Sequence, residues 1–123
     1  MNSHIFKAKS ILPFLFILIC SIPAFSCADT DKPSSAQMKE AEQFNTLGES
    51  YFNQRKYQEA VDAYKQVIRI KPNDDNAHYD LGMTYLLLDN SDSALDQYNI
   101  LKDLNKDLAN KLFNDIGIHS RQK

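Results

Sequence analysis

The residues able to do chemistry in this 123-residue chain are two cysteines, three histidines and one acidic run. The histidines, at positions 4, 78 and 119, do not form the spaced ligand set that zinc requires. The run Asp89–Ile100, DNSDSALDQYNI, superficially has the form of a calcium loop. Such a loop needs glycine at its sixth position and a bidentate acid at its twelfth, and here these positions hold Ala94 and Ile100. We therefore interpret the run as a turn between helices and predict no metal ion or other cofactor.

The first 26 residues have the three parts of a secretory signal peptide. Lys7 and Lys9 give a cationic start, an apolar stretch follows from Ile11 to Phe25, and small residues come next. The stretch contains two prolines and is shorter than the roughly 20 residues of a spanning helix. We predict that residues 1–26 are removed on export and do not remain as an anchor helix.

Cys27 is the only cysteine left after that cleavage, because Cys20 lies inside the apolar stretch. A lone thiol in an oxidising compartment is a liability unless it is modified or paired. Ser26 and Cys27, followed by a polar tail, resemble the bacterial lipoprotein signal, which implies lipidation of Cys27 and a membrane anchor facing the periplasm. Ala24 and Phe25 depart from the usual residues of that signal, so an ordinary cleavage to a soluble periplasmic or secreted product is the alternative.

Catalysis and nucleic-acid binding are both disfavoured by the remaining sequence. It has no glycine-rich phosphate loop, no serine in an elbow motif and no cysteine-histidine pair in the mature domain. Loss of Lys7 and Lys9 leaves 12 basic side chains against 16 acidic ones, a net charge of about −4. Phosphate binding depends on a clustered positive surface, so neither an enzyme nor a nucleic-acid-binding protein is expected.

A short tether is predicted before the folded part of the chain. Residues 27–35 are polar and contain Pro33, which favours a flexible segment, and the folded domain is expected over residues 36–123. Inside that domain six residues recur unchanged 34 positions later. Leu47, Gly48, Tyr51, Ala60, Asp62 and Tyr64 return as Leu81, Gly82, Tyr85, Ala94, Asp96 and Tyr98. Such a repeat indicates stacked structural units.

A 34-residue unit with these residues resembles the tetratricopeptide repeat (TPR). The resemblance implies an all-α fold, a short α-solenoid of two helix-turn-helix repeats at about 41–74 and 75–108, followed by a capping helix at about 107–116. His78 departs from the family's large aromatic residue, and Lys106 departs from its closing proline. We predict helices over residues 36–53, 57–70, 74–88, 92–104 and 107–116.

The repeated residues are expected to bring the helices together. Glycine inside a helix costs about 1 kcal/mol relative to alanine, so Gly48 and Gly82 are expected at close helix contacts, facing Ala60 and Ala94. Leucine and tyrosine four residues apart, as in Leu47 with Tyr51 and Leu81 with Tyr85, form an apolar stripe toward the partner helix. Predicted caps are Ser34 or Ser35, Asn73 or Asp74, and Ser91, with Gly117 ending the last helix.

In the TPR family the first helix of each repeat lines a concave groove. The resemblance therefore implies a partner-binding face made of Asn45, Glu49, Phe52, Tyr79, Met83 and Leu86. The last three share one helical face opposite the Leu81 stripe, and surplus apolar area of this kind usually marks a binding site. The fifth helix, the tether or a second copy of the chain could cover it instead. The groove lacks the basic clamp of chaperone-binding members, so an apolar helix or an extended segment is the expected ligand.

Together these features predict a protein-protein interaction scaffold or adaptor at the bacterial cell envelope, with an envelope protein as partner. The alternative is a structural subunit that forms a homodimer through the same groove, because two repeats and a cap are few for a stable stack.

Overall fold

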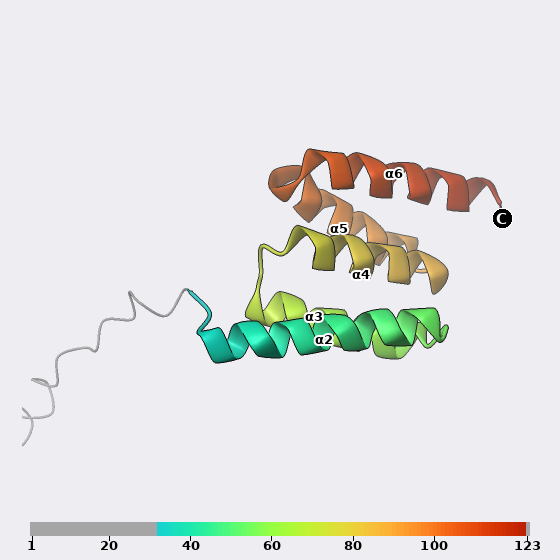
Figure 1. The fold of residues 1–123 in the computed structure, drawn as a ribbon. Coiled ribbons are helices and arrows are strands. Elements are labelled where there is room, and N and C mark those ends of the chain that lie inside the picture. Colours follow the sequence, from blue (N-terminus) through green and yellow to red (C-terminus); the bar gives the residue numbers. More distant parts are fainter. Residues whose placement is uncertain (1–31, 123) are drawn as a thin grey trace, which may run out of the picture. The chain divides into compact units, whose positions relative to one another are not determined.

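The computed structural model describes residues 32–122, and in this part of the chain all regular structure is helical (Figure 1). The helices are α2 (Ser35–Asn53), α3 (Tyr57–Ile70), α4 (Asp75–Leu87), α5 (Ser91–Leu104) and α6 (Lys106–Arg121). Pro33–Lys123 forms a compact unit of its own. The predicted signal peptide and Cys27 lie outside the described residues. Within the described range, no helix is both long enough and apolar enough to cross a membrane.

The helices stack in layers (Figure 1). Helix α2 pairs with α3, α4 pairs with α5, and α6 lies on the second pair, in contact with both of its helices. The two pairs meet through α3 and α4. This arrangement is a short α-solenoid and confirms the predicted all-α fold class.

Polar side chains begin each layer. Ser34 accepts a hydrogen bond from the Gln37 amide, and the Gln37 side chain accepts one from the Ser34 amide, which makes a capping box at α2. Asp74 caps α4 by accepting from the Ala77 amide. Both caps are among the predicted ones. The prediction of Ser91 as the cap of α5 is wrong, because Ser91 is already helical and the Asn90 side chain accepts from the Ser93 amide.

The turns inside the two pairs share one unusual backbone conformation. Arg55 and Asp89, which are 34 residues apart, have φ angles of 61° and 60°. These positions follow α2 and α4, and a left-handed conformation is costly for residues other than glycine, asparagine and aspartate, so the cost falls on Arg55. The repeat therefore extends to the backbone of its turns.

Helix α6 extends further than the sequence suggested. It runs to Arg121 instead of residue 116, and Gly117 lies inside it with no positive φ angle, so the prediction that Gly117 caps the helix is wrong. Two contacts hold the extra turn. The Ser120 hydroxyl donates to the Ile116 carbonyl at 2.8 Å, and His119 Nε2 lies 2.8 Å from Asp89 Oδ1 in the turn before α5.

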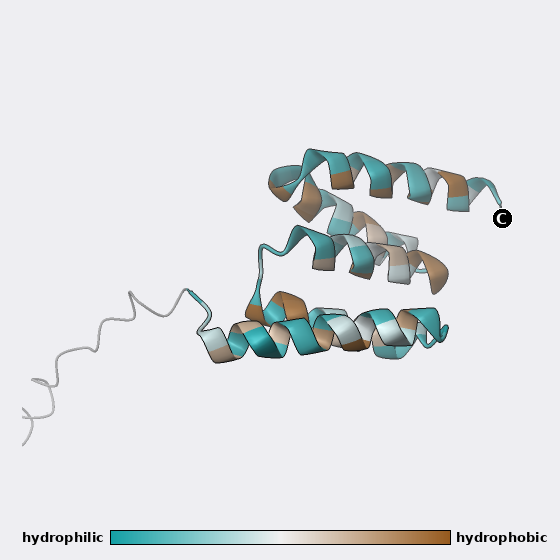
Figure 2. Cartoon of the chain, in the orientation of Figure 1, coloured by the Kyte–Doolittle hydropathy of each residue, from teal (hydrophilic) through white to brown (hydrophobic). Residues whose placement is uncertain are grey.

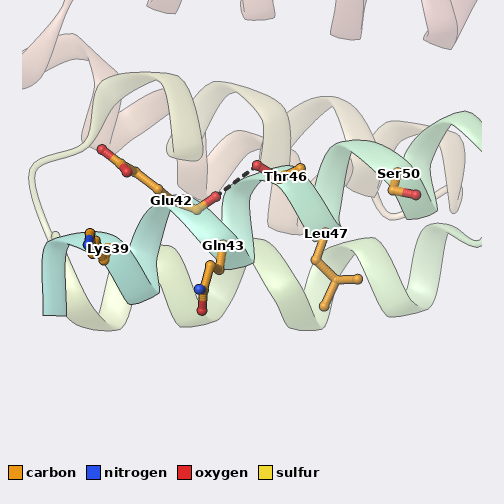
Figure 3. A pocket seen from close by; sticks show the side chains of 6 residues that line it. All are labelled: Lys39, Glu42, Gln43, Thr46, Leu47 and Ser50. Atoms are coloured by element: carbon orange, nitrogen blue, oxygen red, sulfur yellow. Dashed lines mark hydrogen bonds between the residues drawn. The ribbon is translucent and has the colours of Figure 1, made fainter. Parts of the chain in front are cut away.

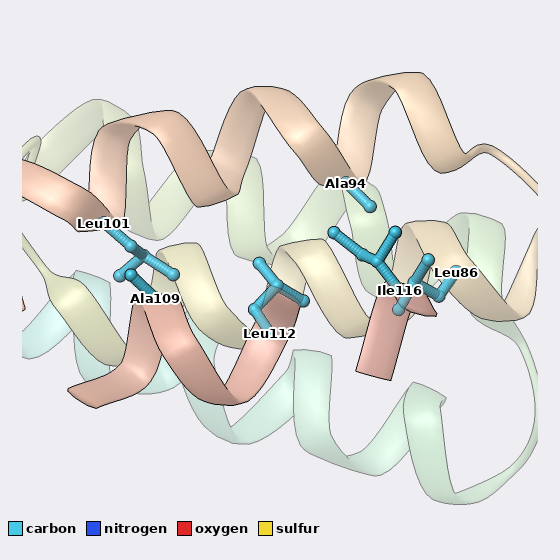
Figure 4. Close-up of a cluster of buried hydrophobic side chains, with 6 residues drawn as sticks. All are labelled: Leu86, Ala94, Leu101, Ala109, Leu112 and Ile116. Atoms are coloured by element: carbon cyan, nitrogen blue, oxygen red, sulfur yellow. The ribbon is translucent and has the colours of Figure 1, made fainter. Parts of the chain in front are cut away.

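The core follows the layer boundaries. The largest cluster joins α4, α5 and α6 and contains Leu86, Ala94, Leu101, Ala109, Leu112 and Ile116 (Figure 4). A second cluster joins the two pairs through Ala60, Val61, Tyr64 and Leu81. The buried apolar residues of α6 lie on the side of the helix that faces the α4/α5 pair (Figure 2). Burial of a leucine side chain contributes about 2 kcal/mol, so α6 is held mainly by this face.

The two repeated glycines do lie at close helix contacts, as predicted. A Cβ at Gly48 would lie 2.7 Å from Cε1 of Tyr64, and one at Gly82 would lie 2.6 Å from Cδ2 of Leu112. The atoms nearest to these positions thus belong to larger side chains than the predicted Ala60 and Ala94. The missing side chain at Gly82 lets Leu112 of α6 pack closely against α4. Gly48 has no such contact with α6, because its near neighbour is Tyr64 of α3.

Candidate functional site

The predicted binding residues lie on α2 and α4, and we call this surface the α2/α4 face. Its α2 part is accessible: Glu49 is exposed, and Asn45 and Phe52 are partly exposed. The Asn45 side-chain amide donates to Glu49 Oε1 at 2.8 Å, which orients both side chains. Phe52 packs edge-on against Tyr57 of α3, with 5.7 Å between ring centroids. This half of the face is open to a partner.

The α4 part of the face is largely covered by α6. Leu86 is only 3% exposed and lies in the same cluster as Leu112 and Ile116 of α6. The prediction that Leu86 contacts a partner is therefore wrong, because the chain's own closing helix buries it (Figure 4). Tyr79 and Met83 are partly buried against the same cluster. Of the covers considered from the sequence, the fifth helix is the one that lies here.

Tyr79 links α4 to α6 through its ring and its hydroxyl. Lys111 Nζ lies 4.7 Å from the ring centroid, and the hydroxyl donates to Asp115 Oδ2 at 3.3 Å. Burial, partly opposed by Lys111, raises the pKa of Tyr79 above its ordinary value. These contacts use the polar end of Tyr79 within the chain, so only the exposed part of its ring is available to a partner.

Negative charge concentrates beside the open half of the face. Burial, followed by the carboxylates of Glu49 and Asp74, raises the pKa of Asp80 on α4 to about 6. Burial, together with Asp80 and Glu49, also raises the pKa of the Tyr64 hydroxyl. Lys111 acts in the opposite direction but does not cancel the effect. The carboxylates of Asp80 and Glu49 thus repel each other, and we call these two residues the acidic pair.

The sequence analysis did not identify the acidic pair, because the sequence does not show which of its 16 acidic side chains are buried or close to another carboxylate. Asp80 directly follows Tyr79, but helical spacing alone does not show that Glu49 of the other pair lies near it. The signal that could have found it is the repeat itself. At that position the equivalent residue of α2 is Thr46, so Asp80 adds a charge where the first repeat has none.

A cleft of about 490 Å³ adjoins the same face. Its walls include Asn45 and Thr46 of α2 and Lys71 and Asp74 before α4. Lys71 Nζ forms an ion pair with Asp74. Burial opposes ionisation of Asp74, but the bonds from Lys71 and the Ala77 amide outweigh it and lower its pKa. This carboxylate is therefore already paired and capping a helix, unlike Asp80.

The histidine that departs from the family pattern has a structural role. His78 is buried, its Nδ1 lies 2.8 Å from Gln97 Oε1, and its Nε2 lies 2.8 Å from the Pro72 carbonyl oxygen. Both ring nitrogens are thus engaged by the chain. Among residues 32–122, no cluster of three or more histidine, cysteine or acidic side chains is arranged to hold a metal ion. In the run Asp89–Ile100 only Asp89 and Asn90 belong to the turn, and the rest lies in α5, so the interpretation of the run as a turn holds for its first two residues alone.

Comparison with known proteins supports the repeat. A family model described as TPR repeat matches residues 48–89, which span the last third of α2, all of α3 and α4, and the start of the turn that follows. Searches of curated proteins and of solved structures gave no match. TPR repeats generally mediate protein-protein interaction, and the family is typically a non-enzymatic scaffold. The stretch that joins the two helical pairs therefore carries TPR sequence in a TPR-like arrangement of helices.

Proposed function

We propose that this chain is an exported bacterial lipoprotein, anchored through Cys27, whose helical domain binds a segment of an envelope protein. The binding surface is the open part of the α2/α4 face, centred on Asn45, Glu49 and Phe52. Support comes from the TPR match, from the exposure of these side chains, and from the lipoprotein-like sequence around Cys27.

The observation that carries the proposal furthest is the acidic pair. Glu49 is exposed, and Asp80 has a pKa raised to about 6 by burial and by neighbouring carboxylates. A cation placed between them relieves that repulsion, so a binding lysine or arginine gains more here than at an isolated carboxylate. Phe52 and the exposed part of Met83 supply apolar area beside it. The partner segment therefore combines a basic residue with a neighbouring apolar one.

A homodimer formed through this face is less well supported. The apolar residues that would drive it are Tyr79, Met83 and Leu86, and α6 already packs against all three. The remaining open surface is acidic, so two copies would bring like charges together.

Photo-crosslinking in cells tests the binding face. A crosslinking amino acid at position 52 is expected to capture one recurrent envelope protein, and the matched position 58, exposed on α3, is expected not to. The charge reversal Glu49→Lys in the same chain should abolish the product from position 52. Scattered, unrelated products, or the same product from position 58, would reject the α2/α4 face as the binding surface.

Membrane fractionation tests the anchor separately. The Cys27→Ser variant should move from the membrane fraction to the soluble periplasmic fraction, because lipid chains contribute about 0.8 kcal/mol per buried methylene. The Cys20→Ser variant serves as the control and should stay with the membrane. Retention of the Cys27→Ser variant in the membrane would reject lipid anchoring without bearing on the binding face.

A further inference from the structure

The closing helix α6 is joined to α5 by a single non-helical residue. Helix α5 ends at Leu104, α6 begins at Lys106, and Asn105 between them is extended, with φ −153° and ψ 101°. The packing contacts of α6 are with α4 and α5 (Figure 4). A change in the backbone of one residue is therefore enough to move α6 away from the second pair as a unit.

The equivalent junction of the first repeat is longer and contains a proline. Lys71–Asp74 separates α3 from α4, and Pro72 is its second residue. The repeat equivalent of Pro72 is Lys106, which is already the first residue of α6. Proline inside a helix costs about 3 kcal/mol, so Pro72 prevents α3 and α4 from joining into one helix. The second junction has no such block, because residues 101–109, LKDLNKDLA, contain neither proline nor glycine.

The apolar spacing of α5 continues through the junction into α6. Five side chains, together with Asn105, form a series in which the intervals alternate between four and three residues. The five are Ala94, Tyr98, Leu101, Leu108 and Leu112, and all belong to or pack against one core cluster. Side chains at such intervals share one face of a helix. A helix that ran without interruption from α5 into α6 would therefore keep a single apolar stripe.

The surface under α6 fits this helix closely. Leu112 lies where Gly82 has no side chain, since a Cβ at Gly82 would be 2.6 Å from Leu112 Cδ2. Tyr79 contacts Lys111 through its ring and Asp115 through its hydroxyl. A second copy of the chain has an identical α6, so it can supply every one of these contacts.

From these observations we propose that two copies of this protein exchange α6. In each copy α5 and α6 join into one helix through Asn105, and α6 packs on α4 and α5 of the other copy. No free docking surface is needed, because each copy vacates the position that it receives. Mutual exchange closes the assembly at two copies, and Lys111 and Asp115 of the second copy then contact Tyr79. This dimer differs from one formed through the open part of the α2/α4 face, which both forms leave accessible.

The junction decides which form is favoured. In the single copy, Asn105 Oδ1 accepts from the Asp107 and Leu108 amides, and Nδ2 donates to Asp75. The joined helix gives up this cap and gains backbone hydrogen bonds through the junction. Because the packing of α6 is the same in both forms, the fraction of dimer depends on concentration and on the residues of the junction.

Sedimentation of the Pro33–Lys123 unit, refolded over a series of concentrations, tests the exchange. The unmodified unit should form dimers, and no larger species, as the concentration rises. Lys106→Pro should weaken dimerisation more than about tenfold, because proline suits the first position of α6 after the extended Asn105 but not the inside of a joined helix. Lys106→Ala is the matched control and should dimerise at least as well as the unmodified unit. A monomer at all concentrations, or equal dimerisation of the two variants, would overturn the proposal.

Two further variants separate exchange from an ordinary surface contact. Asn105→Ala removes the cap and favours helix, so it should strengthen dimerisation by about tenfold or more. Leu47 is 42% exposed in the open cleft along α2 (Figure 3), and Leu47→Asp should leave dimerisation unchanged. Circular dichroism checks that each variant keeps its helices. Weaker dimerisation of Asn105→Ala, or loss of the dimer in Leu47→Asp, would contradict the exchange.

Crosslinking shows which copy each α6 covers. His119 of α6 contacts Asp89, which directly follows Leu88, and the Pro33–Lys123 unit contains no cysteine. The Leu88→Cys and His119→Cys variants, refolded together and treated with a flexible bismaleimide, should give a covalent dimer that links the two variants. Gln43→Cys, exposed on α2, replaces Leu88→Cys as the control and should give no such link to His119→Cys. A dimer that sediments as such but lacks the link between positions 88 and 119 would show that α6 stays on its own copy.

Discussion

Leu47 and Leu81 occupy the same position of the 34-residue repeat, but Leu47 is 42% exposed and Leu81 only 3%. The difference has one cause: α3 lies in front of Leu81, and no helix among residues 32–122 lies in front of Leu47. Identical residues of the repeat thus have different roles. Leu81 packs between the two helical pairs, and Leu47 lies on the exposed side of the first pair.

Truncation of the two leucines should therefore have unequal costs. Leu81→Ala is expected to lower the free energy of unfolding by about 3 kcal/mol, because it leaves a cavity between the pairs, and Leu47→Ala by less than about 1 kcal/mol. Urea unfolding of the Pro33–Lys123 unit at low, monomeric concentration measures both. Similar losses for the two variants would show that Leu47 is buried in solution.

Gly117 and Gly48 should respond to alanine in opposite directions. A Cβ at Gly117 meets nothing within 4 Å, so Gly117→Ala should stabilise α6 by about 0.5–1 kcal/mol. A Cβ at Gly48 would press on the Tyr64 ring, so Gly48→Ala should cost about 1–2 kcal/mol despite the better helix propensity of alanine. Thermal unfolding of the variants gives the comparison.

A double-mutant cycle checks the cause assigned to Gly48. Tyr64→Leu removes the ring that alanine would strike, so Gly48→Ala should cost less in that background. An unchanged cost would mean that the close approach of Tyr64 is not the reason for the glycine.

The fold was accessible from the sequence because its determinants are local and repeated. The cap residue Asp74 acts within a few residues of its own position, and the 34-residue period shows that the same local pattern occurs twice. The end of α6 could not be predicted in this way. Its last turn is held by His119 against Asp89, a contact between residues 30 apart that no local pattern marks.

Only part of the candidate site could be predicted from the sequence, for a related reason. Helical spacing placed Tyr79, Met83 and Leu86 on one face, and they do lie there. Spacing does not show what lies above that face, and α6 buries Leu86. Likewise Asp80 gains its character from Glu49 of the other pair, so its pKa depends on how the layers stack and not on its neighbours in sequence.

Asn105 connects three elements and should be costly to truncate. Its side-chain Oδ1 accepts from the Asp107 and Leu108 amides at the start of α6, and its Nδ2 donates to Asp75 Oδ2 at 2.6 Å. Asn105→Ala should lower the free energy of unfolding by about 2 kcal/mol, since it removes a cap and a link to α4. Asn90→Ala, which removes one capping bond, should cost about half as much in the same denaturation assay.

The free energy of unfolding should depend on pH because of Asp80. Its pKa is raised from 3.8 to about 6 in the folded state, chiefly by burial and then by Glu49 and Asp74. Between these two pH values the folded chain keeps a proton that the unfolded chain has released. The stability that Asp80 contributes is therefore fully present below about pH 4 and is lost as pH rises through 6. Allowing for partial exposure, the loss amounts to about 2 kcal/mol.

Asp80→Asn removes this charge while keeping the size of the side chain. The variant should match the original protein at pH 4 and exceed its free energy of unfolding by about 2 kcal/mol at pH 7.5, as measured by urea unfolding at both values. Glu49→Gln should recover part of that gain, because Glu49 is one of the groups that raise the Asp80 pKa. Parallel pH profiles for Asp80→Asn and the original protein would contradict the raised pKa. They would also remove the main reason to expect a basic residue in the partner segment, since that expectation rests on the repulsion between Asp80 and Glu49.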